Sequence, residues 1–376
     1  MTRSMTPALS LILCSRNDAY MGNSRWRLQT SLDYVGRQVA AIGAADAVEV
    51  LVADWGSEEP LKDVVVLDPA AARIVSFLTV PPALARRCQH DSPFAEVIAL
   101  NAAARRARGT LIGRIDQDTL VGGRFLRTML DWTSGRTPPP APLDAALWFA
   151  NRRDIPYRFA ARCPAFPTVD GFVRWFGRRC PIDRARVFYR ASVGVWLLHR
   201  DRWREAGGYD ERMIYMNDME IDMIERLRPG YPLVDLGPLV GFDFYHLEHY
   251  HPGVPRASSF YRAVNDPHAR EARGINPNGE GWGLAGEDLE VEIAPRSGRP
   301  VTSRWRAFRA APAVAGLGLA TALQAAADLV RYRWGPIGRR RAVAVRRAIR
   351  GAPIGRWPQI LGELVARRNA PRDATR

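Results

Sequence analysis

The sequence predicts an α/β fold in which helices cover a mostly parallel sheet, followed by a basic helical extension at the C-terminus. Short apolar runs alternate with segments of helical spacing, a pattern typical of parallel sheets. The chain has 376 residues and is 47% hydrophobic, so it can bury a full core. The formal net charge of +15 lies entirely in residues 296–376, where 18 arginines accompany three acids. We therefore expect a neutral body and a basic appendage.

Apolar runs mark the strands of the first half, and apolar residues at helical spacing mark its helices. We expect strands at residues 9–14, 48–53 and 73–80, and helices at 25–42 and 94–108. Gly109 is expected to end the second helix. A further strand begins at Leu111 and delivers two acids, Asp116 and Asp118, to its carboxyl end.

The second half follows a Pro-rich loop at residues 134–142. We expect strands at 145–150, 193–199 and 239–246, and helices at 200–206 and 217–226. Residues 151–190 are aromatic and Arg-rich and show no clear period. The expected organisation is one domain, 1–295, divided into halves 1–133 and 134–295, with the extension at 296–376.

The D-x-D pair at residues 116 and 118 indicates a cation site. Two carboxylates at one strand end repel each other unless a cation lies between them. Hard cations such as Mg²⁺ and Mn²⁺ take such oxygen ligands together with substrate phosphates. Ligands of open α/β sheets bind beyond the carboxyl ends of the strands. The alternative is an Asx-type turn with both acids solvated.

The order of five short motifs resembles that of family 2 glycosyltransferases with the GT-A fold, over roughly residues 9–295. In family order these motifs are LSLILCSRN at residues 9–17, DWGS at 54–57, the Asn-containing helix 101–109, DQD at 116–118, and GGYDE at 207–211 followed by NDME at 217–220. The resemblance implies transfer of a sugar from a nucleotide-diphosphate donor to an acceptor hydroxyl, with inversion. It also implies Mn²⁺ or Mg²⁺ as cofactor and a glycan or lipid-linked saccharide as acceptor.

The resemblance also assigns roles to residues. The donor would be bound by Arg16, Asn17, Asp54, Asn101 and Asp116, with Asp54 at the nucleobase. The metal would be held by Asp118, completed by a late histidine, for which we choose His246 over His249 and His251. The general base for the acceptor would be Asp218 or Glu220. The family usually has adjacent Glu-Asp at this point, so the base assignment is ambiguous by two residues.

Several of these residues have alternative roles. Asp54 and Asp218 are also suited to capping a turn or a helix. Asp222 has Arg226 four residues later, which favours a surface ion pair over catalysis. A histidine at a strand end is often a hydrogen-bonded structural residue. The Gly-rich phosphate signature of a nucleotidyltransferase is absent near the first strand, so that activity is a secondary alternative.

The basic extension contains three amphipathic segments, at residues 303–334, 338–350 and 357–368. Such helices suit an anionic membrane surface, or they pack on the body with a solvated Arg face. A nucleic acid is a less favoured partner, because the segments lack a known reader motif. A non-catalytic membrane or nucleic-acid binding protein is the main alternative function. Four scattered cysteines and the lack of a signal sequence or long apolar run predict a cytoplasmic protein, possibly at the inner face of the membrane.

Overall fold

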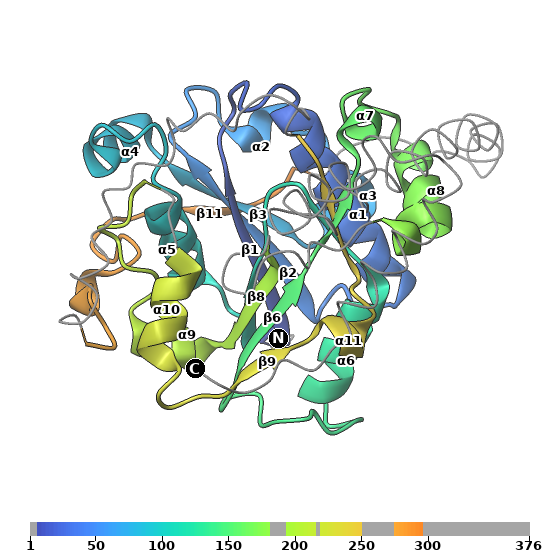
Figure 1. The fold of residues 1–376 in the computed structure, drawn as a ribbon. Helices are drawn as coiled ribbons and strands as arrows, with labels where there is room; N and C mark the ends of the chain where they lie inside the picture. Colours follow the sequence, from blue (N-terminus) through green and yellow to red (C-terminus); the bar gives the residue numbers. More distant parts are fainter. Residues whose placement is uncertain (1–5, 181–192, 216–218, 250–273, 296–376) are drawn as a thin grey trace, which may run out of the picture. The chain divides into compact units, whose positions relative to one another are not determined.

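A computed structural model describes residues 6–180, 193–215, 219–249 and 274–295 (Figure 1). The three segments of the basic extension and Asp218 lie outside these residues. Two sheets and the helices around them make up the described part of the chain. The first half contains β1 (Leu9–Ser15), α1 (Ser24–Ala41), β2 (Val48–Trp55), α2 (Leu61–Val64), α3 (Pro69–Ala72), β3 (Val75–Val80), α4 (Pro82–Gln89), α5 (Glu96–Arg106), β4 (Leu111–Arg114), β5 (Thr119–Val121) and α6 (Gly123–Thr133).

The second half adds further strands to both sheets. Its elements are β6 (Leu147–Asn151), β7 (Arg153–Ile155), α7 (Tyr157–Ala160), α8 (Phe166–Phe176), η1 (Gly177–Arg179), β8 (Val193–His199), α9 (Arg200–Ala206), α10 (Met219–Leu227), β9 (Leu233–Asp235), α11 (Gly237–Val240), β10 (Phe244–Leu247), η5 (Gly279–Gly281) and β11 (Val291–Ile293). No helix of the described ranges is long and apolar enough to cross a membrane.

The main sheet has eight strands in the described chain, in the order β11-β3-β2-β1-β4-β8-β6-β9. Strands β3, β2, β1 and β4 are parallel neighbours, and β8 runs antiparallel between β4 and β6. A smaller sheet follows the order β5-β10-β7. The predicted α/β class with a mostly parallel sheet is confirmed.

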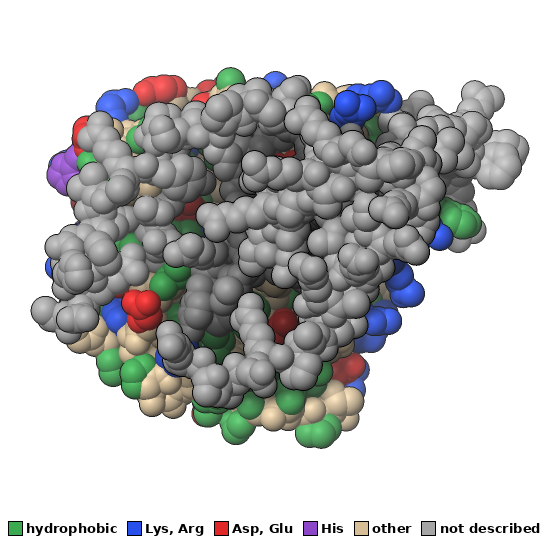
Figure 2. Space-filling view, viewed as in Figure 1, with side chains coloured by type: hydrophobic (Ala, Val, Ile, Leu, Met, Phe, Trp, Pro, Cys, Tyr) green, Lys and Arg blue, Asp and Glu red, His purple; other side chains and the backbone are tan. Residues whose placement is uncertain are grey.

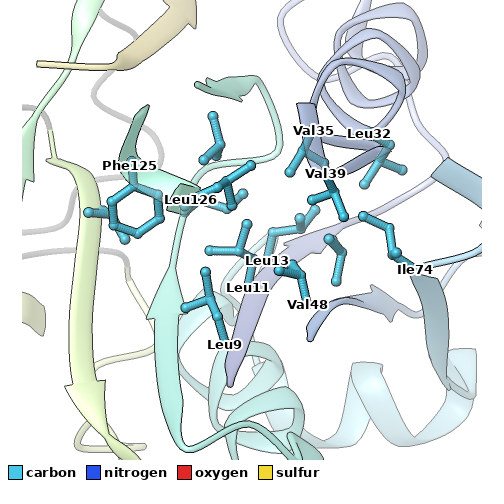
Figure 3. Close-up of a cluster of buried hydrophobic side chains, with 14 of the residues drawn as sticks. Leu9, Leu11, Leu13, Leu32, Val35, Val39, Val48, Ile74, Phe125 and Leu126 are labelled. Atoms are coloured by element: carbon cyan, nitrogen blue, oxygen red, sulfur yellow. The ribbon is translucent and has the colours of Figure 1, made fainter. Parts of the chain in front are cut away.

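Both faces of the inner strands of the main sheet are buried under helices, so these strands are largely apolar, whereas the edge strands β9 and β11 are partly exposed. Leu9, Leu11 and Leu13 of β1 point toward α1 and α6, where they meet Leu32, Val35, Val39 and Leu126 (Figure 3). Ile12 of the same strand joins the core on the opposite face with residues of α5, α9 and α10. This alternation within one strand fixes the register of β1 between the two helical layers.

Several predicted element boundaries differ from the structure by a few residues, and local contacts explain two of these differences. Helix α5 ends at Arg106 because Ala107 is extended, whereas Gly109 lies against β1 and donates its N–H to Ser10 Oγ at 2.7 Å. A Cβ on Gly109 would lie 2.5 Å from the Ser10 main-chain nitrogen, so this contact requires glycine. The strand expected at 239–246 begins only at Phe244, because Pro238 starts the short helix α11 and Gly241, with a φ of +66°, ends it.

Acidic and basic side chains both appear among the described residues that are visible around the rim of the view in Figure 2. This mixture agrees with the composition of residues 1–295, which hold 36 basic and 36 acidic side chains once the extension is subtracted from the totals of 54 and 39.

Candidate active site

The carboxyl ends of β2, β1 and β4 lie side by side, because these strands are adjacent and parallel. Ser15 at the end of β1 is in register with Asp54 of β2, and its hydroxyl donates to Gln117 Oε1 at 2.5 Å. The Ser31 hydroxyl of α1 donates to the Gln117 main-chain carbonyl at 2.6 Å. The Asp116-Gln117-Asp118 turn is therefore fixed at the edge where parallel sheets bind ligands.

Asp118 is buried among three basic side chains from two elements and the segment after β10. The guanidinium of Arg27, on α1, contacts Asp118 Oδ2, and the Nε2 atom of His249 lies 3.3 Å from the same oxygen. The Nε2 atom of His246, on β10, lies 3.3 Å from Oδ1. Arg27 is also held by the carbonyl of Tyr20 at 2.7 Å and by Asn23 Oδ1 at 3.2 Å.

Asp118, His246 and His249 fit a divalent cation as a donor set. One oxygen or nitrogen of each lies within 4.8 Å of the others. The carboxylate oxygens near His246 do not lie in hydrogen-bonding directions, so both of its buried ring nitrogens lack hydrogen bonds to described residues. One carboxylate and two imidazoles suit Mn²⁺, Fe²⁺ or Zn²⁺ better than Mg²⁺, which prefers oxygen ligands. The proximity of Arg27 leaves Oδ1 as the more accessible carboxylate oxygen.

Electrostatics sets the protonation states of these three groups. Burial would raise the pKa of Asp118, but His246, His249 and Arg27 lower it well below its usual value. Burial and the Arg152 charge would lower the pKa of His246, but Asp118 and Asp154 raise it to about 9. Burial lowers the pKa of His249 to about 2. His249 is therefore a neutral imidazole ready to bind a metal, whereas His246 must first release a proton.

Asp116 is paired with two arginines. Arg114 Nη2 lies 2.8 Å from its Oδ1 atom, and the Arg152 guanidinium contacts Oδ2. Arg114 also donates to Glu96 Oε1 at 2.7 Å, and its Nε atom lies 3.5 Å from Glu220 Oε1. One guanidinium therefore contacts both Asp116, which is predicted to bind the sugar donor, and Glu220, which is a predicted base.

A single series of ionic contacts links eight of the charged side chains of the site, and we call this series the buried charge ladder. Arg152 Nε lies 3.4 Å from Asp154, and Asp154 lies 3.2 Å from His246 Nδ1. With the contacts above, the series alternates in sign from one end to the other. Its members, in order, are Glu96, Arg114, Asp116, Arg152, Asp154, His246, Asp118 and Arg27.

Asp54 has the turn-capping arrangement that the sequence left open. It is fully buried, and its carboxylate accepts hydrogen bonds from the Ser57 hydroxyl and, at 2.7 Å, from the Leu61 N–H. Burial raises its pKa in spite of these bonds. Both carboxylate oxygens are occupied in this arrangement. The nucleobase role of Asp54 stays a prediction.

Asn101 holds the Gly-Gly-Tyr turn. Its amide nitrogen donates to the Tyr209 carbonyl at 2.8 Å and to Glu211 at 3.0 Å, and its Oδ1 atom accepts the Tyr209 N–H at 2.7 Å. Gly208 has a φ of +71°, and a Cβ there would lie 2.3 Å from Asn101 Oδ1. The side chain is fully buried. These contacts indicate a structural role, and its predicted contact with a donor stays untested.

Arg16 and Asn17 follow β1 at the same edge. Arg16 pairs with Asp18 at 2.7 Å and donates to the Pro93 carbonyl at 2.9 Å. The Asn17 N–H donates to Ser57 Oγ at 2.8 Å, which ties this loop to the turn after β2. Both residues lie near the predicted donor edge, and their roles stay predictions.

The ion pair between Asp222 and Arg226 forms as predicted, at 2.9 Å, but it is not on the surface. Its side chains are only 2% and 6% exposed, because Arg226 also donates to the carbonyls of Ala206, Gly208 and Ile275 and so joins α10 to neighbouring segments. This buried structural pair makes Asp222 a poor candidate for the base.

Sequence reasoning missed the arginines of this site and the acids Glu96 and Asp154. Two signals could have identified part of the set. Arg27 precedes Leu28 on the buried face of α1, and Arg114 ends an otherwise apolar buried strand. A charged residue at such a position requires a partner of opposite charge. The identity of the partner depends on the fold.

No protein-family model and no curated protein matches the sequence. Several solved structures are similar. A mannosyltransferase from Pyrobaculum calidifontis, in complex with GDP-Man and Mn²⁺, is 17% identical over 96% of this chain and 80% of its own, with a TM-score of 0.40. The catalytic domain of Drosophila beta1,4galactosyltransferase 7, in complex with xylobiose, is 11% identical over 71% of this chain and 82% of its own, with a TM-score of 0.39.

TarS from S. aureus is 10% identical over 64% of this chain, with a TM-score of 0.40, and the match spans only 36% of the TarS chain. These three similarities are weak in both sequence and structure. At such low scores they say nothing about activity. The fold and the site themselves define an α/β protein with a cluster of one carboxylate and two imidazoles, able to hold a metal ion, at the carboxyl edge of its parallel strands.

Proposed function

We propose that this protein is a metal-assisted, inverting glycosyltransferase that moves a sugar from a nucleotide-diphosphate donor to an acceptor hydroxyl. The observation that carries this proposal is the cluster of Asp118, His246 and His249 beside Asp116. It lies at the carboxyl ends of adjacent parallel strands, the position where open α/β sheets bind ligands. The order of the sequence motifs supports the same activity.

The residues of the site have distinct roles in this proposal. Asp118, His246 and His249 would hold Mn²⁺ or a similar cation, which when bound neutralises the charge of the leaving diphosphate. Asp116 would orient the donor beside it, and Arg27 would add positive charge near the phosphates. Displacement at an anomeric carbon passes through an oxocarbenium-like state and needs one base for the acceptor hydroxyl.

Among the residues that the structure describes, Glu220 is the candidate for this base, because Arg114 contacts both Glu220 and Asp116. Asp218 remains the second candidate and lies outside the described residues. The basic extension also lies outside the described residues. Its proposed contact with an anionic membrane surface therefore rests on its sequence, and so does the proposal of a lipid-linked acceptor.

Ligand-dependent stability tests the proposed function. A ligand that binds the folded state stabilises it by about 2.7 kcal/mol at 100 times its dissociation constant. We expect UDP, GDP or dTDP to raise the melting temperature of the wild type, and MnCl₂ to increase this rise. His249→Ala should remove the manganese-dependent part. His90→Asn, which changes an exposed histidine outside the cluster, should retain it. The proposal is wrong if none of the three nucleotides stabilises the wild type with or without Mn²⁺.

A further inference from the structure

Arg114 lies in an unusual place for a guanidinium. It ends strand β4 in the middle of the main sheet, and its side chain is only 8% exposed. Three carboxylates surround it: Glu96 of α5 at 2.7 Å, Asp116 at 2.8 Å and Glu220 of α10 at 3.5 Å. One cation therefore connects a helix on one face of the sheet, the D-x-D turn and the helix that carries the candidate base.

The shape of the guanidinium suits this arrangement. Nη2 contacts both Glu96 and Asp116, while Nε points in a different direction, toward the carboxylate of Glu220. Nε is buried and makes no hydrogen bond with any described residue. Arginine presents five donors in a rigid planar fork, whereas lysine presents a single ammonium on a flexible stem. Arginine is therefore better suited than lysine to keep these three acids in fixed relative positions.

Burial and the charges around Arg114 shift the pKa of Glu96. Glu96 is buried on α5, and this burial, together with the charges of Asp116 and Glu220, raises its pKa to about 7 against the lowering effect of Arg114. Other titratable groups near Glu96 are Cys14 on β1 and Tyr209 in the turn after α9. Glu96 anchors Arg114 by accepting a hydrogen bond from its Nη2 atom at 2.7 Å.

We propose that Arg114 is a positioning residue, which fixes Asp116 on the donor side and Glu220 on the acceptor side relative to each other, with Glu96 as its anchor. This inference rests on the proposed function. It predicts that the guanidinium sets the distance between the donor phosphates and the base. A displacement of about 1 Å at such a site can cost on the order of 100-fold in rate.

Lysine substitution separates positioning from charge. For Arg114→Lys we expect kcat for hydrolysis of the best UDP-, GDP- or dTDP-sugar to fall about 100-fold. The donor KM should change less than about threefold, because the positive charge remains beside Asp116. Arg37→Lys is the matched control: Arg37 pairs with Asp68 at 2.7 Å, outside the site, and this variant should keep wild-type kcat.

A pH profile excludes a purely structural role. Glu96→Gln keeps an oxygen that accepts from Arg114 but cannot ionise, whereas Glu96 gains a negative charge beside Arg114 as pH rises through about 7. The kcat profile of the wild type should therefore show an inflection at about pH 7 that the Glu96→Gln profile lacks, because the charge balance around Arg114 and Glu220 no longer changes there. A group that only stabilised the fold would produce no such inflection in kcat. Urea unfolding of each variant identifies any loss that comes from unfolding.

The outcomes distinguish the two proposals. Wild-type protein that neither binds nor hydrolyses any of the donors overturns the proposed function and, with it, the role of Arg114. Wild-type turnover that Arg114→Lys leaves within about threefold, or a kcat profile near neutral pH that is the same in folded Glu96→Gln as in the wild type, overturns the role of Arg114 alone.

Discussion

Replacing Asp118 with alanine should destabilise the fold as well as remove activity. Asp118 is the carboxylate partner of Arg27, whose side chain is fully buried. The other partners of Arg27 are the neutral Tyr20 carbonyl and Asn23 amide oxygen. Alanine at position 118 would leave a buried guanidinium without its carboxylate.

The magnitude follows from this burial. Removing one partner of a buried ion pair costs about 3–5 kcal/mol, a large part of a typical folding stability of about 5–15 kcal/mol. Replacing both partners with apolar groups is often neutral. We therefore expect Asp118→Ala to lower the free energy of unfolding by about 3 kcal/mol or more. Adding Arg27→Met should restore at least about 2 kcal/mol of it.

Urea unfolding followed by tryptophan fluorescence measures both quantities, since Trp55, Trp148, Trp196 and Trp203 are fully buried reporters. Donor turnover should be absent from the single and the double variant alike, which separates the catalytic loss from the loss of stability. The reasoning fails if Asp118→Ala costs less than about 1 kcal/mol, or if the double variant is no more stable than the single one.

Two further predictions concern Glu96 and the extension. The folded-state pKa of Glu96 is raised from 4.5 to about 7, so the folded state binds the extra proton and its stability falls as pH rises through this interval. At 1.36 kcal/mol per unit, the loss is about 3 kcal/mol. Glu96→Gln should flatten this part of the stability curve measured by urea unfolding, and an unchanged slope would contradict the assignment. Deleting residues 296–376 should abolish sedimentation with phosphatidylglycerol vesicles while leaving donor hydrolysis intact; loss of hydrolysis would instead place the extension in the catalytic unit.

The strands of the main sheet were the most predictable part of the fold. Residues 9–14 and 193–199 are apolar because both faces of their strands are covered, and the runs mark them directly. The short elements could not be predicted in this way. Strand β5 has three residues and α11 has four, too few for any period to appear.

Only part of the candidate site was predictable. The structure places the predicted residues Asp116 and Glu220 beside Arg114 and the predicted residue His246 beside Asp118, and the roles of all four stay predictions. Their arginine partners are distant in sequence: Arg27 is 91 residues from Asp118, and Arg152 is 36 from Asp116. Ion pairs across such separations leave no local pattern, because they are created by the packing of α1 and the β6–β7 segment against the D-x-D turn.

The buried charge ladder has a mechanical consequence. Its members come from α5, β4, β7, β10 and α1 and from the turns between strands, so each ionic contact acts as a cross-brace between elements that the backbone alone would leave free to shift. Displacing one side chain would strain its neighbours on both sides. Charged side chains that are already fixed in position would therefore stabilise the charge that develops during a reaction at this edge. Little reorganisation energy would be needed.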